Sequence, residues 1–299
     1  MTRPEVRIYE VGPRDGLQAE ATVVPIDAKL AFIGMLADAG LREIEATSLV
    51  SPSVIPQMAD ADELLRQLER RPGVRYPVLV PNARGLERAI AADVDAICLI
   101  TAATDSYVQH NIGMSIDESL AAFEPIAAEA RLRGWWIRAY VSAAFGCPYD
   151  GEVDERAVVA VAERLLRLGA DELSISDTVG VAAPSDVRRV VGALVAAGIG
   201  SDVIALHLHD TRGSALANVM AAMELGVGCF DASTGGTGGS PYAPGSAGNL
   251  ATEDLVYLLQ RDGVRTGVDL DGVLAAARFV AGELGSEVTS KVGRAGGWP

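Results

Sequence analysis

The sequence predicts an α/β fold of the (β/α)₈ TIM-barrel class with additional C-terminal helices. Short apolar and β-branched runs alternate with longer stretches of helical period, which gives eight successive β-α units along the 299 residues. Polar residues directly follow the strand candidates, as expected at the mouth of a barrel, where the active site of this fold lies. We therefore expect one catalytic barrel domain over residues 1–299, with a helical extension at about 250–290 packed on it.

The predicted strands are short apolar runs, and the predicted helices are the longer segments between them. The strands cover residues 6–11, 43–47, 76–80, 96–100, 137–141, 172–176, 203–208 and 229–232. The helices lie near residues 26–39, 60–70, 84–92, 116–133, 154–168, 185–197 and 213–225.

Capping residues support several of these helices. Asp27 and Ser115 are candidates for amino-terminal caps, and four glycines follow predicted carboxyl ends, at positions 40, 134, 169 and 226. Residues 235–245 after the last strand contain too much glycine and proline for a helix or strand, so we expect a long loop. Two helices near 250–261 and 271–284 form the extension, and residues 291–299 are expected to be weakly ordered.

The charge of the chain excludes two classes of partner. Forty acidic residues against 25 basic ones give a formal charge of −15, which disfavours binding to nucleic acid and to anionic membrane surfaces. No apolar run approaches the roughly 18 residues that a transmembrane helix needs, and the amino terminus lacks the apolar stretch of a secretory signal. We expect a cytoplasmic protein without nucleic-acid or membrane partners.

The sequence also disfavours a disulfide-bonded fold and several common enzyme classes. Cys98, Cys147 and Cys229 are too few and too widely spaced for a disulfide framework, so we expect reduced thiols. The two lysines, Lys29 and Lys291, lie outside the predicted strands, which disfavours an imine-forming aldolase. The nucleotide-binding, metalloprotease and serine-hydrolase motifs GxGxxG, GxxxxGK[ST], HExxH and GxSxG are absent.

The most informative pattern is the pair His207 and His209 in the seventh predicted strand. Residues two apart on a strand point to the same face, so both imidazoles are expected in the barrel mouth, with Leu208 packed outward. Two convergent neutral imidazoles are good metal ligands; the alternative is a hydrogen-bonded pair in the core. The third histidine, His110, lies in a segment expected to be a polar loop.

Acidic and amide side chains near the same mouth complete the candidate site. Asp15 supplies a carboxylate of the kind that Mg²⁺ or Mn²⁺ prefers, although residues 13–16 also have the composition of a turn in which Arg14 pairs with Asp15. Asn249 is either the cap of the following helix or a neutral oxygen ligand. Glu45, an acid inside a strand, is either structurally paired or catalytic.

Nine short segments, in order along nearly the whole chain, match the motifs of a known family. They are residues 11–18 (VGPRDGLQ), 45–48 (EATS), 56–60 (PQMAD), 79–82 (LVPN), 145–149 (FGCPY), 176–180 (SDTVG), 207–211 (HLHDT), 241–245 (PYAPG) and 248–254 (GNLATED). Together they resemble the 3-hydroxy-3-methylglutaryl-CoA lyases, which belong to the metal-dependent barrel lyases and synthases known as DRE-TIM metallolyases.

The resemblance implies an activity, a cofactor and a set of site residues. It implies cleavage of 3-hydroxy-3-methylglutaryl-CoA, or a closely related 3-hydroxyacyl-CoA, to acetyl-CoA and a 3-keto acid, which is acetoacetate for the parent substrate. It further implies a homodimer and a divalent cation, Mg²⁺ or Mn²⁺. The metal ligands carried over by motif are Asp15, His207, His209 and Asn249, and the catalytic residues are Arg14, Asp15, Glu45, Asp177, His207 and Ser240.

The resemblance implies different roles for these catalytic residues. Arg14 is expected to stabilise the enolate oxygen, and His207 or Asp177 to accept the hydroxyl proton. Glu45 belongs with Asp177 to the surrounding acid-base and hydrogen-bonding groups.

Position 240 departs from the family pattern. The family places a cysteine immediately before the PYAPG motif, thought to help protonate the departing carbanion, and here the residue is Ser240. A hydroxyl is a much weaker acid than a thiol. Two alternatives within the superfamily therefore stay open, namely a lyase acting on a different 3-hydroxyacyl-CoA and a condensing acyl-CoA synthase. An alternative from another class is a catalytically impaired barrel that binds CoA or acts as a scaffold.

Overall fold

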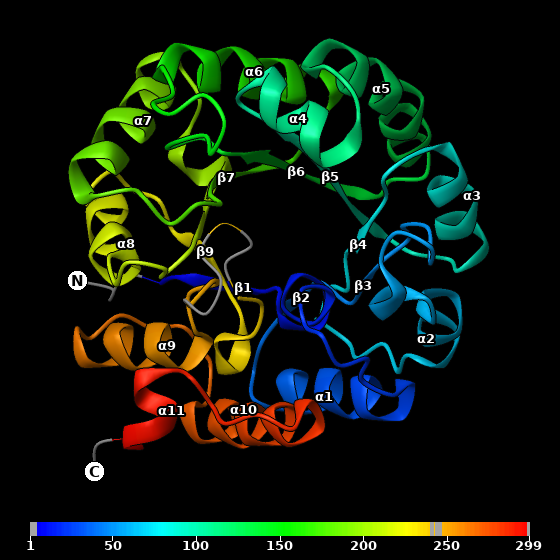
Figure 1. Ribbon diagram of the computed structural model, residues 1–299, viewed down its shortest axis with the longest axis vertical. Helices are drawn as coiled ribbons and strands as arrows, with labels where there is room; N and C mark the ends of the chain where they lie inside the picture. Colours follow the sequence, from blue (N-terminus) through cyan, green and yellow to red (C-terminus); the bar gives the residue numbers. More distant parts are fainter. Residues whose placement is uncertain (1–4, 240–241, 243–246, 298–299) are drawn as a thin grey trace.

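The strands form one parallel sheet that curls into a barrel, as the sequence predicted (Figure 1). The computed structural model describes residues 5–239, 242 and 247–297. The strands are β1 (Arg7–Glu10), β2 (Glu43–Ile44), β3 (Thr47–Ser48), β4 (Val78–Leu79), β5 (Ala96–Ala102), β6 (Trp136–Ser142), β7 (Glu172–Asp177), β8 (Ile204–Leu208) and β9 (Cys229–Ala232). Their order in the sheet is β2-β1-β9-β8-β7-β6-β5-β4-β3.

The second predicted strand closes the barrel by pairing on both sides. Its first half, β2, pairs with β1, and its second half, β3, pairs with β4. Between the halves, the Glu45 N–H donates to the Glu10 carbonyl at 2.9 Å, and the Ala46 N–H donates to the Pro77 carbonyl at 2.9 Å. The residues of one chain segment thus join the two ends of the sheet, which accounts for nine strands where eight were predicted.

The helices surround this barrel on the outside (Figure 1). They are α1 (Ile26–Asp38), α2 (Ala61–Gln67), α3 (Ala83–Ala91), α4 (Asp105–Ile112), α5 (Ile116–Leu132), α6 (Glu155–Leu168), α7 (Pro184–Ala196) and α8 (Ala215–Met223). The C-terminal helices are α9 (Thr252–Arg261), α10 (Leu270–Leu284) and α11 (Lys291–Ala295), and α10 packs against α1. No helix in the described part of the chain is long and apolar enough to cross a membrane.

The capping predictions hold at one position and fail at another. Ser115 caps α5 in a full capping box with Glu118, because each side chain bonds the backbone N–H of the other. Asp27 lies inside the first turn of α1, where the N-cap position belongs to Pro25. The acid still faces the positive end of the helix dipole, which explains its place there.

Two predicted irregular segments are helical. Residues 105–112 form α4, whose cap Thr104 accepts a hydrogen bond from the Tyr107 N–H, and His110 lies exposed on this helix. The tail, expected to be weakly ordered, contains α11 with the cap Ser290 and a buried Val292. Short helices without a broad apolar face leave little periodic signal in a sequence.

The inside of the barrel is unusually polar. Tyr9, Cys98 and Tyr140 share it with Arg138, whose side chain is fully buried. Cys98, like Cys147 and Cys229, is a buried free thiol, as the cysteine spacing predicted. A buried charge requires paired and hydrogen-bonded partners, and the partners of Arg138 lead to the candidate site.

Candidate active site

The carboxyl ends of the strands surround a cavity of about 790 Å³. Its walls include Arg14 and Asp15 after β1, Tyr140 on β6, and His207 and His209 at the end of β8. These side chains come from stretches of sequence that lie far apart, as the barrel prediction required.

Asp15, His207 and His209 form a candidate metal centre. Each offers one ligand atom, and these atoms all lie within 4.8 Å of one another. The Nδ1 of His207 lies 3.2 Å from the Asp231 carboxylate, so this nitrogen carries the proton and Nε2 keeps its lone pair. A carboxylate that orients a ligating histidine in this way is the usual arrangement around protein-bound metals.

His209 provides a direct test of whether a cation fits here. Its buried Nδ1 has no hydrogen-bond partner among the residues that the structure describes. Burial and the neighbouring His207 lower the pKa of His209 to about 3, so the ring is neutral and offers lone pairs at physiological pH. An unsatisfied buried imidazole is costly unless something binds it, and the donor set therefore fits a divalent cation.

Asn249 contacts the same carboxylate and does not cap a helix. Its Nδ2 donates to Asp15 Oδ2 at 2.8 Å and to the Thr237 carbonyl at 3.2 Å. The helix α9 begins three residues later, and its N-cap position is Ala251. The capping alternative for Asn249 is thus excluded, and the side chain lies against the candidate metal centre.

Residues 12–16, which resemble a turn in sequence, form a short π-helix that holds Arg14 and Asp15 in place. The side chain of Arg14 is only 2% exposed; Nε donates to Glu45 at 2.6 Å and one terminal nitrogen donates to Asp15 at 2.7 Å. Burial opposes the charge on Arg14, but the two carboxylates raise the pKa of the guanidinium well above its usual range. The predicted Arg14–Asp15 pair is present, within a π-helix in place of the expected turn, and the role of Asp15 as a metal ligand stays a prediction.

The same pairing keeps Asp15 ionised. Burial acts against the charge, but Arg14 and the two imidazoles lower the pKa of Asp15 to about 2. The carboxylate is therefore available to a cation at physiological pH.

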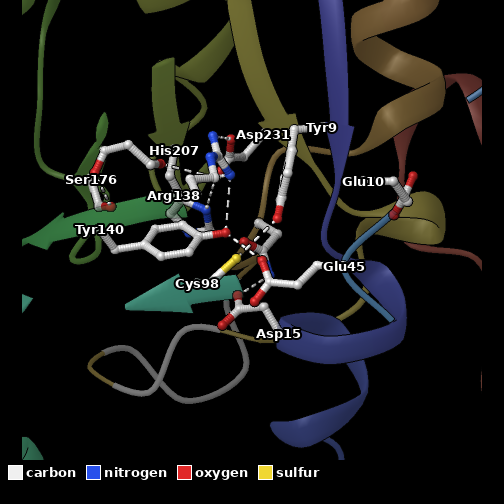
Figure 2. Close-up of polar contacts among 12 residues, drawn as sticks. Tyr9, Glu10, Asp15, Glu45, Cys98, Arg138, Tyr140, Ser176, His207 and Asp231 are labelled. Atoms are coloured by element: carbon white, nitrogen blue, oxygen red, sulfur yellow. Dashed lines mark hydrogen bonds and ion pairs between the residues drawn. The ribbon is translucent and has the colours of Figure 1, made fainter. Parts of the chain in front are cut away.

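Glu45 is fully buried and belongs to a chain of hydrogen bonds across the barrel. Besides Arg14, it accepts a hydrogen bond of 2.5 Å from the hydroxyl of Tyr140, which in turn accepts one of 3.0 Å from Arg138. Arg138 also binds Asp231 through both terminal nitrogens, at 2.5 and 3.1 Å (Figure 2). Arg138 thus connects the residues that position Arg14 with the carboxylate that positions His207.

Sequence reasoning did not identify Arg138 or Asp231. Both lie inside predicted strands, and only the closure of the barrel brings β6 and β9 face to face across its centre. The available signal was their charge, because ionised side chains inside strands need partners.

Glu10, at the end of β1, was missed for the same reason. Its buried carboxylate accepts hydrogen bonds from the Gly12 N–H at 2.8 Å, from Thr234 and from Thr252. Burial raises the pKa of Glu10, although these donors act in the opposite direction. Glu10 therefore ties the π-helix that holds Arg14 to the loop after β9 and to the start of α9.

Among the described residues that the resemblance implies, Asp177 is not part of the cavity wall, and neither are Glu45 and Asn249. The carboxylate of Asp177 accepts backbone hydrogen bonds from Val181 and Ala182, each at 3.0 Å, and burial raises its pKa. Asp177 thus holds the loop that follows β7, from which Thr178 does line the cavity. Ser240 lies outside the described residues.

Comparison with known proteins shows the family to which this chain is related. A sequence model of the HMGL-like family matches residues 5–280. The bovine mitochondrial hydroxymethylglutaryl-CoA lyase is 45% identical over 291 residues, which cover 97% of this chain and 89% of the relative.

Solved structures agree with this relationship. The hydroxymethylglutaryl-CoA lyase of Pseudomonas aeruginosa superposes with a TM-score of 0.96 at 40% identity and covers 99% of this chain and 98% of its own. The lyase of Acinetobacter baumannii, solved with coenzyme A and 3-methylmalate, superposes with a TM-score of 0.93 at 38% identity, covering 98% of this chain and 95% of its own. The chain belongs to the HMGL-like family.

Proposed function

We propose that the protein is a divalent-metal-dependent lyase that cleaves 3-hydroxy-3-methylglutaryl-CoA to acetyl-CoA and acetoacetate. The observation that carries this proposal is the convergence of Asp15, His207 and His209 beside the buried Arg14 in one cavity. The family membership and the names of the relatives support the substrate.

Asp15, His207 and His209 would hold the cation, and Asn249 lies close enough to Asp15 to contribute its amide oxygen. When bound, a Mg²⁺ or Mn²⁺ ion supplies Lewis-acid stabilisation of negative charge on the oxygens of the substrate. The unsatisfied Nδ1 of His209 and the low pKa of Asp15 are the features of this chain that favour the ion.

Cleavage begins with loss of the proton from the tertiary hydroxyl. His207 has one ring nitrogen free, because Nδ1 is bonded to Asp231. That nitrogen cannot be both a metal ligand and a proton acceptor, so we assign it to the ion. Asp177 is then the proton acceptor, since burial raises its pKa and each of its oxygens keeps a second lone pair beside the one used by the loop. Because its carboxylate is not part of the cavity wall, the proton would have to reach it through a side chain or a water molecule at that wall.

The carbon–carbon bond between the carbinol carbon and the carbon next to the thioester then breaks. The electron pair of that bond moves toward the thioester to form an enolate, while the deprotonated carbinol oxygen forms the carbonyl group of acetoacetate. Arg14 is fixed by Glu45 and Asp15 before the substrate arrives, so its charge faces the developing enolate without reorganisation. Protonation of the enolate gives acetyl-CoA. The family cysteine is thought to help this protonation, so its replacement by Ser240 bears on the source of the proton.

The acyl-CoA is expected to enter through the cavity mouth. A related lyase binds coenzyme A and 3-methylmalate, and a cavity of about 790 Å³ is large enough for the acyl group and part of the carrier. The proposal includes a homodimer and a cytoplasmic location; curated relatives include cytoplasmic and mitochondrial lyases.

The test is to incubate the purified protein with 3-hydroxy-3-methylglutaryl-CoA and Mn²⁺ and to follow both products by mass spectrometry. We expect acetyl-CoA and acetoacetate in equal amounts. A protein that binds Mn²⁺ but releases neither product from this substrate would contradict the assignment, and a panel of other 3-hydroxyacyl-CoAs would then identify a different acyl group.

A further inference from the structure

Residues 289–292, which we call the C-terminal latch, contact two loops that carry candidate site residues. The latch joins α10 to α11, and Figure 1 shows α11 beside α9 and α10 at the outer edge of the barrel. One contacted loop follows β9 and leads toward Asn249; the other follows β8 and begins next to His209. No motif or periodicity in the tail predicts that it reaches either loop.

The latch holds the loop after β9 at Gly235. The Thr289 hydroxyl donates to the Gly235 carbonyl at 3.2 Å. The Gly235 N–H donates at 3.0 Å to Glu253, whose other carboxylate oxygen accepts a hydrogen bond from the Ser290 hydroxyl. Glu253 and Ser290 are buried, so the N–H side of this glycine is fixed by groups that water does not replace, whereas Thr289 on the carbonyl side is exposed.

The latch also holds the turn after β8. The Lys291 ammonium pairs with the buried carboxylate of Asp210, the residue after His209. The other oxygen of Asp210 accepts a hydrogen bond from the Ala215 N–H at 3.0 Å, and its own N–H donates to the Gly248 carbonyl at 2.6 Å. Asp210 thus connects α8, Lys291 and the residue before Asn249.

Asp254 completes the attachment on the other side. Its carboxylate accepts hydrogen bonds from the backbone N–H groups of Lys291 and Val292, at 3.2 and 2.7 Å. Ser290, Lys291 and Val292 of the latch are therefore held by the buried carboxylates of Glu253, Asp210 and Asp254, which distinguishes the latch from a loosely packed tail.

Both contacted loops continue directly into the candidate metal centre. Two residues after Gly235, the Thr237 carbonyl accepts a hydrogen bond from Asn249, and the Gly238 carbonyl accepts one from the Asn249 N–H at 3.3 Å. A displacement of either loop would move Asn249 or His209 relative to Asp15, and misplacement of about 1 Å is enough to slow a reaction up to a hundredfold.

We propose that the C-terminal latch is a positioning element for the lyase reaction, because its contacts with Gly235, Glu253 and Asp210 fix the loops that carry Asn249 and His209. The latch touches neither the cavity nor the substrate, and it acts through these loops. The inference rests on the proposed function, because its test measures the rate of the lyase reaction.

The experiment uses the full-length chain with saturating Mn²⁺. The disruptive variant is the double substitution Ser290→Ala and Lys291→Met, and the conservative variant is Lys291→Arg, which keeps the charge opposite Asp210. Arg294→Ala, an exposed residue of α11, is the matched control. We expect kcat of the double variant to fall about tenfold to a hundredfold while KM changes less than twofold. The Lys291→Arg variant and the control should keep kcat near the wild-type value.

The latch proposal is overturned if the folded double variant keeps the wild-type kcat. It is equally overturned if Lys291→Arg loses kcat as the double variant does, at a temperature where circular dichroism shows it to be folded, or if the double variant does not fold. A wild-type protein that releases no acetyl-CoA refutes the proposed function, and the latch proposal with it, whereas an active wild type with unaffected variants refutes the latch alone.

Discussion

Asp231 binds His207 Nδ1 at 3.2 Å with a carboxylate oxygen that Arg138 also contacts, at 3.1 Å. Burial would favour the neutral acid, but the guanidinium lowers the pKa of Asp231, so the oxygen facing the imidazole is charged. The tautomer and orientation of His207 are thus set by Asp231 on the adjacent strand β9, whose carboxylate is held in turn by Arg138 on β6.

Replacing Asp231 by Asn should weaken metal binding, and it should also lower the free energy of unfolding, because Asp231 is a buried charged partner of Arg138. An amide cannot supply the charged acceptor, and loss of such an orienting group typically lowers metal affinity by about 10- to 100-fold. We expect this loss in a Mn²⁺ titration by isothermal calorimetry. Asp202→Asn, at an exposed position just before β8, is the control and should bind Mn²⁺ as the wild type does. Equal affinity of the two variants would show that Asp231 does not position His207.

Replacing Asn249 by Ala separates the two functions considered for this residue. Because Ala251 occupies the N-cap position of α9, we do not expect the loss of about 1 kcal/mol that removal of a helix cap produces. The expected effect is weaker Mn²⁺ binding and a lower kcat, since Asp15 loses its amide donor. Urea denaturation and a Mn²⁺ titration measure the two quantities, and a less stable protein with unchanged metal affinity would show that Asn249 has only a structural role.

The fold was largely predictable from the sequence, whereas the contacts that hold the site residues in place were not. The strand positions and most helix positions follow from local periodicity, which survives in any tertiary context. The pairing of His207 with Asp231 and of Asn249 with Asp15 joins residues that are distant in sequence, so no local pattern encodes it.

Local patterns also failed where the chain departs from regular geometry. Residues 12–16 have turn composition, but the contacts of Arg14 with Glu45 and Asp15 accompany a π-helical conformation there. The division of the second strand into β2 and β3 likewise depends on its two neighbours in the closed barrel, β1 and β4.

Glu253 should make the stability of the protein depend on pH. Burial, with a smaller contribution from the charge of Asp254, raises the pKa of Glu253 from 4.5 to about 7 in the folded state. In the unfolded chain the Glu253 carboxyl ionises at a lower pH than in the folded protein. Its contribution to the free energy of unfolding is therefore fully present below pH 4.5 and is lost as pH rises toward 7. The free energy of unfolding of the wild type should therefore fall between pH 5 and pH 7 by roughly 2 kcal/mol relative to Glu253→Gln.

Urea denaturation of both proteins at pH 5, 6 and 7 measures this difference. A parallel pH dependence in the two proteins would show that Glu253 is not the group responsible. The comparison with Glu253→Gln is necessary because burial also raises the pKa of Glu10 and Asp177.

Ser240→Cys should increase turnover if protonation of the enolate limits the reaction. A thiol exchanges protons near neutral pH far more readily than a hydroxyl does, and a well-placed proton donor contributes about 100-fold or more. We expect kcat to rise while KM stays constant, measured by release of acetyl-CoA. Ser240→Ala is the control; if all three proteins turn over equally, position 240 does not supply the proton.

The central claim is that Asp15, His207 and His209 bind one divalent cation on which carbon–carbon cleavage depends. The most direct measurement is a titration of metal-depleted protein with Mn²⁺, in which bound metal and the rate of acetyl-CoA release from 3-hydroxy-3-methylglutaryl-CoA are recorded together. The account predicts no activity without metal and a rate that rises in proportion to Mn²⁺ bound until one ion per chain is reached. Full activity in the metal-free protein, or activity that does not follow occupancy of a single site, would contradict it.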